Sequence, residues 1–398
     1  MRDAAHRVLE TLRMSNGLYL ASTSDAYRYV WIRDVCYISL AFLQSHPLSL
    51  TPQLQVAPER TPSTELQTSP RHPQSTHPQP DDRYEQTYHS MLDIFHQYRW
   101  KLDYHAEHRP REAFEYMHPR YHADTLRELE EPWGNAQNDA IGAFLYGIAI
   151  GLRHGKRMIR HEADCDLINQ FIRYLTTLAF WEDADNGMWE ENREIHASSI
   201  GACTAGLLAL QPWFTVDWDV IRRGMTALYA LLPRESASKD CDLAQLSLIY
   251  PYQLVPPDVA RSIVARVESE LLRDRGVIRY KGDQYYRRAE GEADHAQAHT
   301  GHPGAPGDPT GHAPTDHTEA EWCLGLPWLG LCWFTLGDHA RALSYLSRTE
   351  QVMTRPGVLP ELYYGGTDRP NPQTPLAWAV SMYIQLFDAL AGLRGSTL

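Results

Sequence analysis

Hydrophobic residues recur at steps of three and four along most of the chain, which is the spacing of helices that bury one face. One such stripe consists of Trp218, Ile221, Met225, Leu228 and Leu232. The same spacing predicts further helices at about residues 2–13, 31–45, 84–105, 135–154, 161–181, 197–210, 259–271, 319–336, 338–350 and 376–390. The exception is segment 276–286, where β-forming residues flank a Gly-Asp turn and predict a small β-hairpin.

Two stretches interrupt the helical pattern. Residues 46–82 are rich in Pro, Ser, Thr and Gln, and residues 290–318 are rich in Gly, Pro, Ala, Asp and His. Neither composition supplies enough apolar surface to offset the entropy of ordering, so both are expected to be disordered insertions. Histidine-rich stretches can bind metals, but no cysteine or regular ligand spacing accompanies these histidines. We therefore expect no metal site and no cofactor.

Eleven or so helices with almost no strand predict an all-α protein, built as a ring of helical hairpins with a site at one end. An α-solenoid would also be helical, but the chain shows no fixed-period repeat. The aromatic and acidic motifs of the chain span residues 29 to 378, and one site assembled from all of them requires one fold. We therefore expect residues 1–398 to form a single domain with the two insertions.

Composition narrows the functional class. The net charge of −13 argues against a nucleic-acid partner, which a basic surface would attract. The six cysteines occur singly, without a C-x-x-C pair, and are expected to be free thiols in a reducing compartment. The N-terminus does not resemble a secretion signal, and no segment has the apolar length of a membrane span. A soluble cytoplasmic protein without membrane contact is therefore expected.

Two motifs combine aromatic and polar residues. Trp31-Ile32-Arg33-Asp34 places an indole beside an Arg and a carboxylate, which together can hold vicinal sugar hydroxyls. The alternative is a buried ion pair, with Asp34 near the start of the following helix. Trp133, Gln137 and Asp139 lie just before an apolar helix and are typical of a carbohydrate platform, although this polar group could also be a helix N-cap.

Two acidic motifs, far apart in sequence, supply candidate catalytic carboxylates. Trp189-Glu190-Glu191 follows a turn signal, and an indole beside a carboxyl lowers the local polarity, which suits a general acid. Glu361 lies between apolar and aromatic residues, with Tyr363 close by and Trp378 further on, which suits a general base. Hydrolysis of a glycosidic bond needs two such carboxylates. The alternative for the first motif is an exposed acidic turn.

The ordered motifs resemble the signatures of glycoside hydrolase family 15, the glucoamylase family. They are Trp31-Ile32-Arg33-Asp34, Trp133-Gly134 with Gln137 and Asp139, Trp189-Glu190, Leu359-Pro360-Glu361 and Pro375-Leu376-Ala377-Trp378. Within this family the chain is most similar to the branch that contains the amino-terminal domain of phosphorylase kinase α and β subunits and its bacterial relatives. Segments 16–22, 194–201, 276–283 and 360–364 carry that closer similarity. The resemblance covers about residues 10–393 apart from the insertions.

The resemblance implies an (α/α)6 barrel and exo-acting, inverting hydrolysis of α-glucosidic bonds. Glu190 would be the general acid and Glu361 the general base. Arg33 and Asp34 would hold the terminal glucose. The other residues expected at the sugar site are Trp31, Trp133, Gln137, Asp139, Trp189, Arg279, Tyr363 and Trp378.

The sequence thus predicts a hydrolase of short α-glucans or oligosaccharides that releases glucose. The alternative is a non-catalytic carbohydrate-sensing domain, because the phosphorylase kinase branch is a regulatory part of a larger enzyme. The presence of both acids favours the hydrolase. A synthase or phosphorylase on a similar ring would need a basic phosphate-binding cluster near the acids, and the sequence shows no convincing one. The choice between α-1,4 and α-1,6 linkages stays open.

Overall fold

The computed structural model describes residues 1–43, 82–130, 133–286 and 319–395, so nearly all of both predicted insertions lies outside the described residues. The described residues form twelve α-helices, four 3-10 helices and four short strands. The α-helices are α1 Arg2–Leu12, α2 Ile32–Ser39, α3 Arg83–Gln97, α4 Arg99–His105, α5 Asn138–Arg153, α6 Glu162–Leu178, α7 Ala197–Leu210, α8 Trp218–Leu231, α9 Pro257–Glu270, α10 Gly325–Thr335, α11 His339–Gln351 and α12 Ala377–Gly395. The 3-10 helices are η1 Asp25–Tyr27, η2 Leu40–Phe42, η3 Ala113–Glu115 and η4 Leu243–Leu248, and the strands are β1 Tyr29–Trp31, β2 Arg120–His122, β3 Glu321–Trp322 and β4 Leu362–Tyr363.

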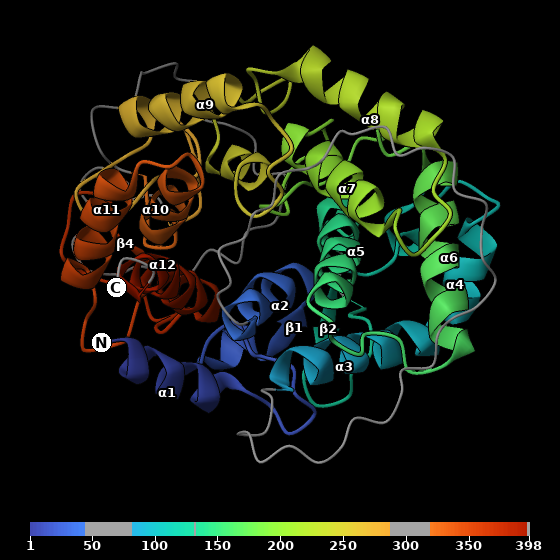
Figure 1. Ribbon diagram of the computed structural model, residues 1–398, viewed down its shortest axis with the longest axis horizontal. Coiled ribbons are helices and arrows are strands. Elements are labelled where there is room, and N and C mark those ends of the chain that lie inside the picture. The colour runs from blue at the N-terminus through green and yellow to red at the C-terminus, as the bar shows by residue number, and fades with distance from the viewer. Residues whose placement is uncertain (44–81, 131–132, 287–318, 396–398) are drawn as a thin grey trace.

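The helices form a two-layered ring (Figure 1). The inner elements α2, α5, α7, η4, α10 and α12 contact one another in that order, and α12 contacts α2 to close the ring. The outer layer consists of α1, α3 with α4, α6, α8, α9 and α11. Outer and inner elements alternate along the chain, which makes six outer–inner pairs. The predicted all-α (α/α)6 architecture is confirmed.

The hydrophobic pattern explains which helices lie inside. In α5 every residue from Asn138 to Gly151 is buried, because apolar and small side chains surround the whole helix. The outer helix α8 buries only one stripe, made of Val220, Ile221, Gly224 and Leu228. A helix that is apolar all round needs neighbours on every side, whereas an amphipathic helix covers the ring from outside.

The most extensive contact in the inner ring lies between α5 and α7, and it depends on glycine. A Cβ at Gly142 would lie 2.3 Å from the carbonyl carbon of Ala202, and one at Gly206 would lie 2.6 Å from the carbonyl oxygen of Gly142. A change of side-chain rotamer cannot relieve such a clash, because the atoms that the Cβ would meet belong to the backbone of the neighbouring helix. The two glycines therefore allow α5 and α7 to pack closely together. The N-terminal ends of these helices lead into the candidate site.

We expect Gly142→Ala to lower the free energy of unfolding by about 1–3 kcal/mol, the usual range for overpacking a core. Gly392→Ala is the matched control, since Gly392 also lies in a helix but has open space around it. The control should raise stability by about 0.5–1 kcal/mol through helix propensity. Urea unfolding of both variants measures the difference, and equal stabilities would contradict this account of the α5–α7 contact.

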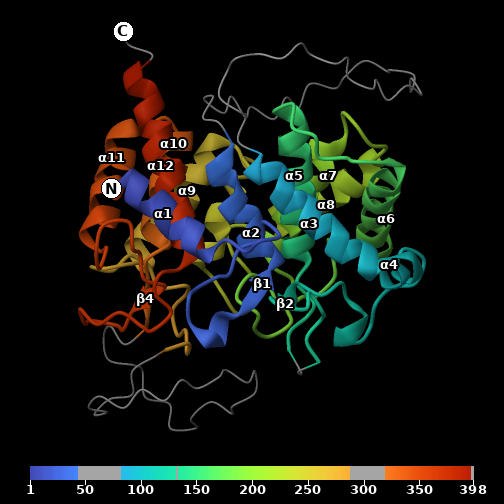
Figure 2. The same cartoon turned by 90° about the horizontal axis from the view of Figure 1, so that it is seen from below.

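The strands lie at one end of the ring. β1 pairs with β2, and β3 pairs with β4, both antiparallel. Figure 2 shows β1, β2 and β4 together on the side of the ring where α2 begins. Because α2 starts directly after β1, this end carries the Trp31–Asp34 motif.

Segment 276–286 differs from the predicted hairpin. Val277 makes isolated bridges with Leu272 and Trp322, and Tyr280 bridges Asp242. The β-forming residues thus pair outside the segment, Val277 with nearby Leu272 and with distant Trp322, and not across the Gly282 turn. Similarly, the helix predicted at 319–336 begins only at Gly325, because residues 321 and 322 pair with β4.

The six cysteines are free, and all but Cys165 are buried. In the part of the chain that the structure describes, no helix combines the length and the apolar character needed to cross a membrane.

Candidate functional site

Glu190 lies in the turn before α7, and a separate donor holds each oxygen of its carboxyl group. The indole Nε1 of Trp133 donates to Oε2 at 2.7 Å, and Nη2 of Arg33 donates to Oε1 at 3.3 Å. The backbone of Glu190 has φ +63°, a left-handed conformation that costs energy for a residue with a side chain. The strained turn and the two donors together fix the direction of this carboxyl group.

Arg33 links three segments of the site. Its buried guanidinium donates through Nη1 to both carboxylate oxygens of Asp139, at 3.0 and 3.2 Å, and to Oε1 of Gln137 at 3.1 Å. Gln137 in turn donates to the carbonyl oxygen of Gly134 at 2.7 Å. The carboxylate partners of Arg33 are therefore Asp139 and Glu190. No side chain caps α5 at its N-terminus, so the helix-cap alternative for this motif does not apply.

Glu361 lies just before β4 and is buried. The hydroxyl of Tyr27 donates to its Oε1 at 2.6 Å, and the side-chain amide of Asn371 donates to its Oε2. The hydroxyl of Tyr285 lies 2.7 Å from that of Tyr27. Burial raises the pKa of Glu361 to about 7, although both donors favour the ionised form. Glu361 can therefore change its protonation state near neutral pH.

Asp34 connects the two acids electrostatically. Burial raises its pKa to about 7; Arg33 opposes this shift, while the negative charge of Glu190 adds to it. Asp34 also contributes to the raised pKa of Glu361. Asp34 thus lies within electrostatic reach of both candidate catalytic groups, and together with Glu190, Glu361 and Arg33, which binds Glu190, it forms one charged cluster.

Arg279 lies among aromatic rings next to this cluster. Its guanidinium binds both carboxylate oxygens of Asp283, at 2.6 and 2.7 Å, and donates to Glu191 at 3.0 Å. Its Cζ is 5.3 Å from the ring of Trp189 and 5.0 Å from the ring of Tyr285. Because Tyr285 contacts Tyr27, which donates to Glu361, and Trp189 directly precedes Glu190 in the chain, Arg279 links the surroundings of the two acids.

The structure changes the expected role of the two tryptophans. The ring nitrogen of Trp189, the neighbour of Glu190 in sequence, donates to Asp242 at 2.8 Å. The indole that contacts Glu190 is that of Trp133, 57 residues away. Trp31 packs edge-on against Tyr27, with ring centroids 5.3 Å apart.

Two of the expected site residues have other neighbours. The hydroxyl of Tyr363 donates to the carbonyl oxygen of Val352 at 2.9 Å. The ring of Trp378 packs against Tyr37 and Trp328, at centroid distances of 4.7 and 5.6 Å. The structure thus places both side chains in the packing around the acids and not in contact with them.

The residues that sequence reasoning missed are Tyr27, Asn371, Tyr285 and Arg120. Tyr27 lies four residues before Trp31, the first residue of a motif that was recognised, so its position was a usable signal. Tyr285 lies in the segment that suggested a hairpin. Asn371 and Arg120 lie outside every motif, and only the fold brings Asn371 to Glu361 and Arg120 to the ring of Trp133.

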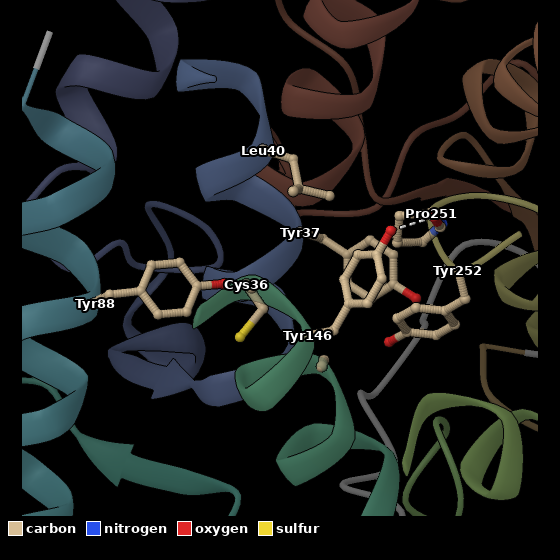
Figure 3. Close-up of a pocket in the computed structure, with 9 residues that line it drawn as sticks. Cys36, Tyr37, Leu40, Tyr88, Tyr146, Pro251 and Tyr252 are labelled. Atoms are coloured by element: carbon tan, nitrogen blue, oxygen red, sulfur yellow. Dashed lines mark hydrogen bonds between the residues drawn. The ribbon is translucent and has the colours of Figure 1, made fainter. Parts of the chain in front are cut away.

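Neither of two hollows in the structure is lined by an expected site residue. Figure 3 shows a cavity between α2, α3 and α5 in which the Tyr146 hydroxyl donates to the carbonyl oxygen of Pro251 at 2.7 Å. Its volume of about 10 Å³ corresponds to about one water molecule, which is too small for a sugar. A surface hollow of about 470 Å³ lies between α9 and the turn from α10 to α11. Among the described residues, no group of three or more His, Cys, Asp or Glu side chains is arranged to hold a metal ion.

No protein-family model matches the chain. Its sequence is 26% identical over 317 residues to a probable phosphorylase b kinase regulatory subunit alpha of Caenorhabditis elegans, covering 69% of this chain and 25% of that protein. It is also 26% identical over 309 residues to the liver isoform of this subunit from Mus musculus, covering 67% of this chain and 24% of that protein. The chain spans about a quarter of the length of these curated relatives.

Solved structures share the fold over nearly the whole chain. A wild-type glycosidase matches with a TM-score of 0.70 and 20% identity, covering 98% of this chain and 96% of that one. The glucoamylase of Hormoconis resinae matches with a TM-score of 0.60 and 13% identity, covering 98% and 72%. A glycosidase structure in complex with glucose matches with a TM-score of 0.68 and 20% identity, covering 98% and 96%. The fold is that of glucoamylases, and the sequence relatives are phosphorylase kinase subunits, as the motifs indicated.

Proposed function

We propose that this chain hydrolyses α-glucosidic bonds at the non-reducing end of short glucans or oligosaccharides, with inversion at the anomeric carbon. One observation carries the proposal: on a glucoamylase-type fold, two carboxyl groups, Glu190 and Glu361, are each held by their own hydrogen-bond donors, with Asp34 within electrostatic reach of both. Structures with this fold include glycosidases, one of them solved in complex with glucose.

In this proposal Glu190 is the general acid. It protonates the leaving oxygen of the glycosidic bond and is left as a carboxylate. Trp133 and Arg33 each donate a hydrogen bond to this group, and a charge-assisted hydrogen bond stabilises the carboxylate that forms. The stabilisation from these two hydrogen bonds therefore grows as the proton leaves Glu190. Catalysis requires interactions of this kind, which are stronger in the transition state than in the ground state.

Glu361 is the general base. It takes a proton from the water that attacks the anomeric carbon, so it must be ionised before the reaction begins. The Tyr27 hydroxyl and the Asn371 amide bind different oxygens of Glu361 and fix its orientation. The same hydrogen bonds stabilise the ionised form against the cost of burial.

The polar groups near the acids suit a sugar. Asp34 keeps part of its surface exposed, and its carboxylate can accept hydrogen bonds, while Arg279 is a donor among aromatic rings. Carboxylates and guanidinium groups bind sugar hydroxyls, and indole rings cover the apolar faces of a pyranose. We assign Arg33, Asp34, Trp31, Trp189 and Arg279 to the binding of the terminal glucose.

A second function has support from the sequence relatives, which are named as regulatory subunits. In that case the same site would bind a glucose unit without turnover and report its presence to a partner. Release of glucose separates the two functions.

The direct test is a screen of the purified protein against maltose, isomaltose, maltotriose, panose, trehalose and dextran, with glucose release as the readout. We expect release from at least one α-glucoside. Binding of maltose or isomaltose in calorimetry without release of glucose from any substrate would instead support the sensing function.

The pH dependence of kcat/KM follows from Glu361. Because burial raises its pKa to about 7 and only its ionised form acts as a base, kcat/KM should fall about tenfold per pH unit below that value. Tyr27→Phe removes a donor to the ionised carboxylate, raises the pKa further, and should move this acid limb to higher pH. Tyr345→Phe is the control, since its hydroxyl donates to Glu268 on the outer layer. An acid limb that stays in place in Tyr27→Phe would contradict the assignment of Glu361.

A further inference from the structure

Arg120 packs against the face of the Trp133 indole, which donates a hydrogen bond to Glu190. It is on β2, directly opposite Trp31 on β1, and is 4% exposed. Its Cζ lies 4.2 Å from the centroid of the Trp133 ring, 4.7 Å from Tyr29 and 5.6 Å from Trp31. A buried cation is thus in contact with three aromatic rings, and one of them donates a hydrogen bond to the candidate general acid.

The contact affects both the position and the chemistry of Trp133. A cation over an indole face is attracted by the ring quadrupole, and the attraction is strongest where water is excluded. It therefore favours the ring orientation in which Nε1 points at Oε2 of Glu190, 2.7 Å away. A positive charge over the ring also withdraws electron density from it, which makes the N–H group a stronger donor.

The titratable groups beside Arg120 include His118 and Lys101, and neither of them removes its positive charge. His118 accepts a hydrogen bond from the backbone of Arg120 at 3.2 Å. Burial lowers the pKa of His118 to about 3, with a further contribution from Lys101 and Arg120, so this imidazole is neutral at neutral pH. Lys101 is paired with Glu128 at 3.1 Å.

We propose that Arg120 is a positioning residue for the general acid, acting on Glu190 through Trp133. As the O–H bond of Glu190 breaks and the proton moves to the leaving oxygen of the glycosidic bond, Glu190 becomes negatively charged. Arg120 keeps the Trp133 N–H directed at that charge and strengthens the hydrogen bond. This inference rests on the proposed hydrolase function, and it assigns a role to a residue that lies in none of the family motifs.

Leaving-group chemistry separates this role from a merely structural one. Hydrolysis of a glucoside needs protonation of the leaving oxygen, whereas α-glucosyl fluoride releases fluoride, which needs little help from an acid. We expect Arg120→Met to lower kcat for the glucoside about 100-fold, the scale of a small displacement at a reacting group. The loss on α-glucosyl fluoride should stay below about threefold. Trp133→Phe, which removes the N–H donor and keeps a ring, should give the same pattern.

Arg28→Met is the matched control, because Arg28 precedes β1, is exposed and pairs with Asp124 at 2.7 Å. It should leave both rates unchanged. If Arg120→Met does not fold, Arg120→Lys replaces it in the test, because it keeps a cation at this position. The loss of kcat in Arg120→Lys should be smaller and should still be confined to the glucoside. Equal losses on both substrates, or no loss on either, would overturn the role of Arg120. A wild-type protein that hydrolyses neither substrate would overturn the proposed function itself.

Discussion

Glu361→Gln is expected to lower kcat by about two to four orders of magnitude, the usual contribution of a general base. The substituted side chain has the same shape but cannot take a proton from the attacking water. The loss should be similar for α-glucosides and for α-glucosyl fluoride, because both reactions need an activated water. Steady-state glucose release on the two substrates measures the effect.

The fold of Glu361→Gln should stay intact. Because burial raises the pKa of Glu361 from 4.5 to about 7, the folded protein binds more protons than the unfolded chain between these values, and the wild type loses stability as pH rises through this window. The neutral Gln avoids this cost, so the Tm of the variant at pH 8 should not fall below that of the wild type. Full activity in the variant would remove Glu361 from the mechanism.

Glu190→Gln should also lower kcat by about two to four orders of magnitude on α-glucosides, since the leaving oxygen is no longer protonated. In contrast to the previous variant, it should retain most of the activity on α-glucosyl fluoride. The two variants therefore assign acid and base separately by leaving-group dependence.

Glu268→Gln is the matched control for both substitutions. Glu268 accepts a hydrogen bond from the Trp333 indole and from the Tyr345 hydroxyl, each at 2.7 Å, but it lies on outer helix α9. It thus reproduces the Trp and Tyr donors of Glu190 and Glu361 away from the candidate site, and its loss should leave kcat unchanged. A Glu190→Gln variant that loses equal activity on the glucoside and the fluoride would contradict its role as the acid.

The fold could be predicted from the sequence because its signals are local. The apolar periodicity of each helix and the order of the motifs both lie within short segments, and the inner helices are recognisable by their nearly continuous apolar character. The errors occurred where pairing is distant. Val277 and Trp322 are bridge partners although 45 residues separate them. Val277 was therefore assigned to a hairpin, and Trp322, which lies in strand β3, was assigned to the start of a helix.

The candidate site was predictable only in its acidic and aromatic motifs. Which indole contacts Glu190 depends on how the segments before α5 and α7 meet, so Trp189 was the natural choice from sequence and Trp133 is the contact in the structure. Arg120 and Asn371 carry no local signal, because an isolated Arg or Asn is usually a surface residue. Their importance comes from the three-dimensional contacts alone.

The stereochemistry of the first product tests the central claim most directly. If Glu190 protonates the leaving oxygen while Glu361 activates a water on the opposite face, the carboxyl groups must be far enough apart for that water, about 6.5–9.5 Å in inverting enzymes. Proton NMR of the early reaction on an α-glucoside should then show β-glucose before mutarotation. Initial release of α-glucose would require a covalent intermediate and would contradict the account.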